Sequence, residues 1–168
     1  MEYTVLTPLS KLKANNLWIT QPKWHKAKYE LTDDAFVYAK IYTEGFWHTT
    51  TIFETEDEKL TIKHTSISGL EITGAGGKVL GTIDRNLLKG TTTLTLTGGR
   101  VLTYYCESIW KADYIWRDSF NNELIRMKFG SMSGKVSVSF DKRAADIPYF
   151  AALVFIAFKL NLDNSEGG

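Results

Sequence analysis

Short stretches in which apolar and polar residues alternate run along the chain from Leu17 to Asp141. In Lys135–Phe140 every second residue is apolar, and Thr91–Thr97 and Glu123–Phe129 show a similar alternation. A period of two places successive side chains on opposite faces of a β-strand. The pattern therefore predicts a sheet with one buried face and one face in water.

Turn-forming residues separate these stretches, as at Gly74–Gly77, Gly98-Gly99 and Asn121-Asn122. Tight hairpin turns favour such residues because the backbone there needs positive φ. The chain therefore reads as successive antiparallel hairpins. After a first strand near Leu17, we expect strands over Trp24–Leu31, Ala35–Tyr42, Trp47–Glu54, Leu60–His64, Leu70–Thr73, Lys78–Ile83, Thr91–Thr97, Arg100–Cys106, Ala112–Arg117, Glu123–Phe129 and Lys135–Phe140.

The segment after the strands has a different character. Ile147–Phe158 carries no polar side chain except the hydroxyl of Tyr149. Asp146 suits a helix cap, and Pro148 suits the first helical turn. The sequence predicts a helix over about residues 147–161, followed by a disordered tail over 163–168.

A helix that is apolar all round must be buried on every side. This one is shorter than the roughly 20 residues that a membrane span needs, although a tail anchor remains the alternative. The preceding strands bury it if they close around it. We therefore expect a mainly β chain, a closed antiparallel barrel of about twelve strands around a buried C-terminal apolar helix, in one domain over 1–168.

Composition narrows the function classes. The 168 residues carry a formal net charge of +1, which supplies no global field for nucleic acid or for a membrane. The single cysteine, Cys106, excludes an intrachain disulfide. The N-terminus lacks the basic and apolar regions of a secretory signal, so a cytoplasmic location is expected.

The hairpins and the helix together resemble the tubby-like superfamily, and within it the LURP-one-related and phospholipid-scramblase-like proteins. The carriers are tryptophans at the expected strand starts, the final helix, and one hairpin with a polar turn: Trp24, Trp47, Trp110, Trp116, Pro148–Leu160 and Tyr114–Phe129 with Asp118 and Asn121-Asn122. The resemblance implies a closed barrel threaded by its C-terminal helix, with functions that include phosphoinositide binding and membrane association. No scramblase calcium signature carries over, and fold alone assigns no function.

Catalytic and metal-binding patterns are weak. His25, His48 and His64 fall on separate predicted strands without metal-ligand spacing. Gly74–Gly81 lacks the glycine and the Ser or Thr of a phosphate-binding loop, and Cys106 has no local base. The sequence therefore predicts no cofactor, no metal and no catalytic site.

Basic residues near tryptophans give the one candidate binding surface. Lys26 and Lys28 share a strand face, Lys23 precedes them, and Arg126 and Lys128 share another wet face. Cations in such pairs attract anionic headgroups at a membrane surface. We expect a non-catalytic module that binds anionic phospholipids or phosphoinositides peripherally, without a transmembrane span. The alternatives are an ordinary solvated face, scramblase-like lipid transfer, and a soluble scaffold or small-ligand carrier.

Overall fold

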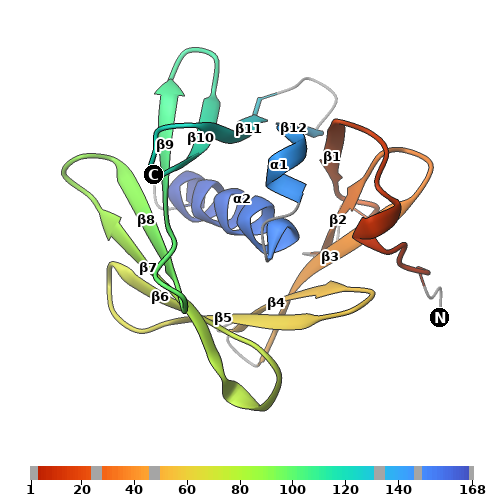
Figure 1. Ribbon diagram of the computed structural model, residues 1–168, viewed down its shortest axis with the longest axis horizontal. Coiled ribbons are helices and arrows are strands. Elements are labelled where there is room, and N and C mark those ends of the chain that lie inside the picture. The colour runs from red at the N-terminus through yellow and green to blue at the C-terminus, as the bar shows by residue number, and fades with distance from the viewer. Residues whose placement is uncertain (1–3, 24–27, 46–49, 131–134, 146–148, 167–168) are drawn as a thin grey trace.

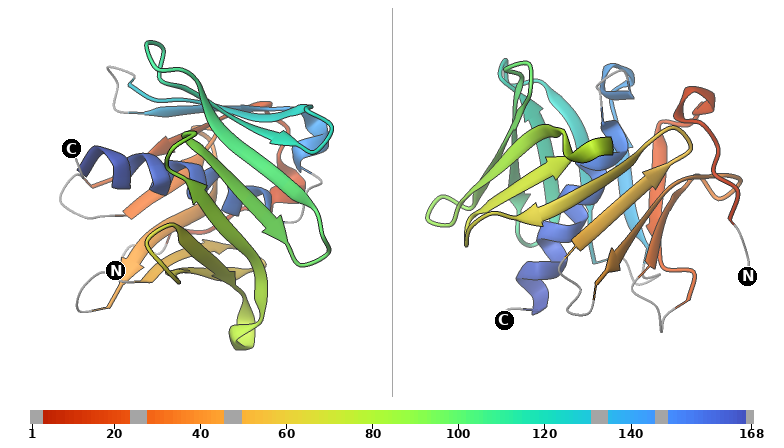
Figure 2. Two further views of the ribbon diagram at one scale, coloured as in Figure 1. Left: turned by 90° about the vertical axis from the view of Figure 1, so that its left-hand side faces the viewer. Right: turned by 90° about the horizontal axis from the view of Figure 1, so that it is seen from below.

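The computed structural model describes residues 4–23, 28–45, 50–130, 135–145 and 149–166 (Figure 1 and Figure 2). Within these ranges, twelve strands form one closed barrel. The strands are β1 (Asn16–Thr20), β2 (Lys28–Thr32), β3 (Val37–Glu44), β4 (Thr50–Thr55), β5 (Lys59–His64), β6 (Gly69–Thr73), β7 (Val79–Asn86), β8 (Thr91–Leu96), β9 (Val101–Ser108), β10 (Asp113–Asp118), β11 (Glu123–Lys128) and β12 (Val136–Phe140). The helices are α1 (Lys142–Ala145) and α2 (Phe150–Glu166), with 3₁₀ turns η1 (Leu9–Lys11) and η2 (Ala75–Gly77).

Each strand pairs antiparallel with the strand that follows it, and β1 closes the barrel against β12. In this closing ladder Leu17 lies opposite Val138, and both side chains are buried inside. Closure leaves the sheet without a free edge. The prediction of a closed twelve-strand antiparallel barrel is confirmed.

Helix α2 passes through the middle of the barrel, surrounded by strands in Figure 1. Its residues from Phe150 to Phe158 are all buried. The Phe155 ring stacks on Phe53 of β4 at 6.0 Å between centroids, and the Trp116 indole donates to the Leu153 carbonyl at 3.0 Å. Because the strands cover every side of the helix, its all-apolar surface meets no water. The predicted core helix is confirmed.

The end of α2 differs from the prediction. The helix continues to Glu166, so residues 163–166 are helical, and the prediction of a disordered tail there is wrong. Lys159 pairs with Asp163 one turn later at 3.3 Å, which supports the polar last turns. The predicted helix start at Asp146 and Pro148 lies outside the described residues.

Two tryptophans that were expected at strand starts lie elsewhere. Trp110 sits in the turn between β9 and β10, fully exposed, and not at a strand start as the sequence suggested. Trp116 lies inside β10 and is fully buried. Trp24 and Trp47 are outside the described residues, as are the expected first residues of β2 and β4.

Antiparallel order places alternate connections at the same end of the barrel. We call the end where α2 begins the N-rim; it holds the β2–β3, β4–β5, β6–β7, β8–β9 and β10–β11 connections. The other end, where α2 ends, is the C-rim; it holds the β5–β6, β7–β8 and β9–β10 hairpins and the remaining strand connections. Ring contacts agree with this direction, because Phe150 packs on Phe140 near the N-rim and Phe158 packs on Tyr29 near the C-rim.

Candidate functional site

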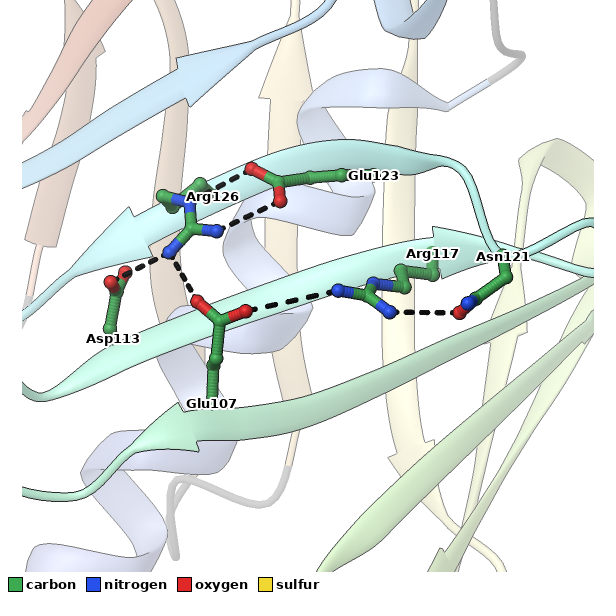
Figure 3. Close-up of polar contacts among 6 residues, drawn as sticks. All are labelled: Glu107, Asp113, Arg117, Asn121, Glu123 and Arg126. Atoms are coloured by element: carbon green, nitrogen blue, oxygen red, sulfur yellow. Dashed lines mark hydrogen bonds and ion pairs between the residues drawn. The ribbon is translucent and has the colours of Figure 1, made fainter.

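The strongest polar cluster centres on Arg126, on the outer surface of β9, β10 and β11 (Figure 3). Its Nε and Nη2 donate to the two carboxylate oxygens of Glu123, both at 2.8 Å. Its Nη1 donates to Glu107 at 2.6 Å and to Asp113 at 2.7 Å. One guanidinium therefore joins carboxylates from three neighbouring strands.

A second arginine extends the cluster. Arg117 lies 3.8 Å from Glu107, donates to Asn121 at 2.9 Å, and stacks 5.2 Å from the Tyr105 ring centre. The hydrogen bond to Glu123, followed by the one to Glu107, raises the pKa of the Arg126 guanidinium. The same contact with Arg126 lowers the pKa of Glu123. Both directions favour the ionised forms of Arg126 and Glu123.

The cluster does not present a positive charge. Three carboxylates face two guanidiniums, so the group is acidic overall, and Arg126 is committed to its partners. The geometry does not favour the sequence-based hypothesis that Arg126 binds an anionic headgroup. Glu107 and Asp113 flank the β9–β10 turn, so Arg126 instead fixes the base of that hairpin.

Replacing this arginine tests the structural role. We expect Arg126→Gln to lower the free energy of unfolding by about 2 to 4 kcal/mol, because Asp113, only 5% exposed, loses its ion-pair partner. Urea denaturation measures the change. Arg143→Gln is the control, since the exposed Arg143–Asp141 pair contributes little. Equal stability losses in the two variants would contradict a structural role for Arg126.

The predicted lysines that the structure describes lie at the C-rim but do not form one cluster. Lys28 begins β2, half-buried, with its Nζ 3.9 Å from Glu30. Lys128 ends β11, exposed, and Lys23 is exposed after β1. Strands β1 and β12 separate Lys28 from Lys128, and the register adds an offset of four residues, a separation of roughly 20 Å. Lys26 lies outside the described residues.

Two further C-rim lysines were missed by the sequence interpretation. Lys89 lies in the β7–β8 turn and Lys111 in the β9–β10 turn, and both are exposed. Each follows two apolar residues, as Leu87-Leu88-Lys89 and Ile109-Trp110-Lys111. The sequence signal that could have found them is an apolar pair followed by lysine, which occurs twice between strand-like stretches.

The other candidate groups stay apart. His64 is exposed at the end of β5, and Cys106 is half-buried on β9; His25 and His48 lie outside the described residues. Among the side chains that the structure describes, no three His, Cys, Asp or Glu groups are placed to hold a metal ion. No helix in the described part of the chain has the length and apolar content to cross a bilayer.

One hollow lies at the N-rim, beside the first turn of α2. Its volume is about 280 Å³, and its walls include Leu9, Phe53, Asp57, Glu58 and Ala152. Figure 2 shows η1 and the N-terminal segment outside the barrel wall rather than within it. Leu9 of η1 and the first turn of α2 both line the hollow. The centre of the barrel is filled by apolar side chains of α2.

Comparison with known proteins gives a fold and no family. No family model matches the chain, and no curated protein matches it. A protein of Arabidopsis thaliana, known from an X-ray structure, is similar in fold with a TM-score of 0.62 and 11% sequence identity. The match covers 95% of this chain and 99% of that one. At this identity the likeness shows the shared barrel architecture alone.

Proposed function

We propose that this chain is a non-catalytic module that binds anionic phospholipid surfaces peripherally through its C-rim. The observation that carries the proposal is a set of exposed lysines at the C-rim, two of which directly follow exposed apolar residues in hairpin turns. Four exposed lysines lie at the C-rim, distributed around it: Lys23, Lys89, Lys111 and Lys128. The carboxylates of the Arg126 cluster are occupied, which leaves Glu44 and Asp84 as the exposed acids of the described C-rim strands.

The N-rim has the opposite balance in two of its turns. Asp33 and Asp34 lie in the β2–β3 turn, and Glu56, Asp57 and Glu58 lie in the β4–β5 turn. An anionic membrane attracts each nearby lysine by about 1 kcal/mol and repels carboxylates. These two acidic turns disfavour contact between that part of the N-rim and an anionic membrane, while exposed Lys78 and Arg100 lie on other N-rim turns.

The packed interior supports binding without transfer. Apolar side chains of α2 fill the barrel, so a polar headgroup has no wet route along the helix. The resemblance to the tubby-like superfamily supports the same class of ligand, because phosphoinositide binding is among the functions that it implies.

Sedimentation with liposomes tests the proposal. We expect binding to vesicles that contain phosphatidylserine or phosphoinositide, weaker binding at higher salt, and none to neutral phosphatidylcholine. Lys89→Glu/Lys111→Glu is expected to weaken binding roughly 1000-fold, because each of two attractions of about 1 kcal/mol becomes a repulsion of similar size. Lys78→Glu/Arg100→Glu, the matched change on exposed N-rim turns, should leave most of the affinity.

Two results would overturn the proposal. Absence of binding at both salt concentrations would leave a soluble scaffold or carrier as the interpretation. Equal losses in the two charge-reversal variants would show that affinity follows net charge and not the C-rim.

A further inference from the structure

Large apolar side chains project into water at three hairpin turns of the C-rim. Leu88 and Trp110 are 100% exposed, and their neighbours Leu87 and Ile109 are mostly exposed. Ile67, in the β5–β6 turn, is 92% exposed. Single exposed apolar residues are ordinary, but a group of them marks a contact surface.

The three turns are neighbours on the barrel. The β5–β6, β7–β8 and β9–β10 hairpins follow one another in the strand order, so their bases are about 10 Å apart. In Figure 1 the β7–β8 hairpin projects to the left, the β5–β6 hairpin to the lower left and the β9–β10 hairpin toward the top. We call Ile67, Leu87, Leu88, Ile109 and Trp110 the apolar tips.

Polar side chains, and not the apolar tips, shape these turns. Asn86 Oδ1 accepts from the Lys89 amide at 3.0 Å, and Ser66 Oγ accepts from the Gly69 amide at 2.8 Å. In the third turn Ser108 Oγ accepts from the Lys111 amide at 3.3 Å. The backbone conformation of these turns therefore does not depend on the exposed apolar side chains. Such side chains are typical of a surface that contacts a partner.

The neighbouring charges indicate what that partner is. In two of the turns a lysine directly follows the apolar pair, Lys89 after Leu88 and Lys111 after Trp110. Tryptophan and aliphatic tips with adjacent lysines match an anionic membrane, where apolar groups reach the acyl boundary and cations stay with the phosphates.

We propose that the apolar tips insert into the interfacial layer of an anionic membrane, with Lys89 and Lys111 at the headgroup phosphates. This inference rests on the proposed lipid-binding function. It adds which side chains hold the barrel on the membrane and which end of the barrel faces the lipid. The Arg126 cluster serves it, because Glu107 and Asp113 hold the base of the hairpin that carries Trp110.

The affinity of variants for vesicles distinguishes insertion of the apolar tips from attraction by charge alone. We expect Leu88→Asn/Trp110→Asn to weaken binding to phosphatidylserine vesicles roughly 30-fold, since two buried tips are lost. Phe36→Asn/Phe120→Asn removes two exposed aromatic rings from N-rim turns and is the matched control, expected to stay within about twofold of the parent.

Fluorescence gives a direct reading of depth. Lipids brominated on the acyl chain should quench part of the tryptophan emission of the parent protein, and Trp110→Phe should remove that part while keeping the binding. The other four tryptophans are the same in both proteins, so the difference in quenching between the parent and Trp110→Phe reports Trp110 alone.

The outcomes distinguish the two proposals. Salt-sensitive binding that survives Leu88→Asn/Trp110→Asn, without acyl-chain quenching, would retain the lipid module and overturn insertion. No vesicle binding by the parent protein would overturn both. A dimer in sedimentation velocity that this variant dissociates, without quenching on vesicles, would assign the apolar tips to a second copy of the chain and overturn insertion.

Discussion

Ala157→Arg is expected to prevent the chain from reaching a soluble, cooperatively folded state. Ala157 is 0% exposed in the middle of α2, and its carbonyl already accepts a hydrogen bond from Asn161. An arginine there brings an unpaired charge into an apolar interior, at a cost of several kcal/mol, and overfills a packed core. Total stabilities of domains are only about 5 to 15 kcal/mol. Soluble yield and thermal unfolding by circular dichroism measure the result.

The same substitution at another alanine of α2 is the control. Ala152 is also buried, but it lines the hollow at the N-rim together with Asp57 and Glu58. An arginine at this position can extend its head through the hollow toward these carboxylates. We expect Ala152→Arg to fold with reduced stability. A folded Ala157→Arg with the melting temperature of the parent would contradict a helix enclosed on every side.

Phe155→Ala is expected to lower the free energy of unfolding by about 3 to 5 kcal/mol. The ring is fully buried and packs on Phe53 across the barrel, so truncation leaves a cavity that the closed wall cannot fill. Urea denaturation measures the loss. Phe120→Ala, at a ring that is 85% exposed, should change stability by less than about 0.5 kcal/mol. Similar losses in both variants would contradict tight packing of α2 against the strands.

The architecture was predictable because its signals are local. The alternation in Lys135–Phe140 sets which face of β12 is buried, and Gly99 takes the positive φ, 83°, that a tight turn requires. The all-apolar segment Ile147–Phe158 is too short to span a bilayer, so the strands of the barrel must bury it. The extent of α2 was not predictable, because its last turns are polar and are supported by pairs such as Lys159–Asp163.

The charged site was harder to predict, because register decides it. Arg126 faces carboxylates on β9, β10 and its own strand, and nothing local in the sequence shows that Glu107 and Asp113 meet there. The positive charge of Arg126, considered alone, had suggested that it binds an anionic ligand. The repeated apolar pair before Lys89 and Lys111 was visible in the sequence. The pattern indicated a common surface only after the antiparallel strand order had placed both turns at the C-rim.

The position of the central helix in the chain has a consequence for how the protein is made. Synthesis delivers all twelve strands before α2, so the wall of the barrel exists for a time without its filling. The ladder between β1 and β12 joins the first and last strands, a contact of long sequence separation that forms slowly. Until α2 arrives, the inward faces of the strands present apolar surface to other chains. We expect a chain that stops before Phe150 to keep these faces exposed and to aggregate instead of folding as a smaller domain.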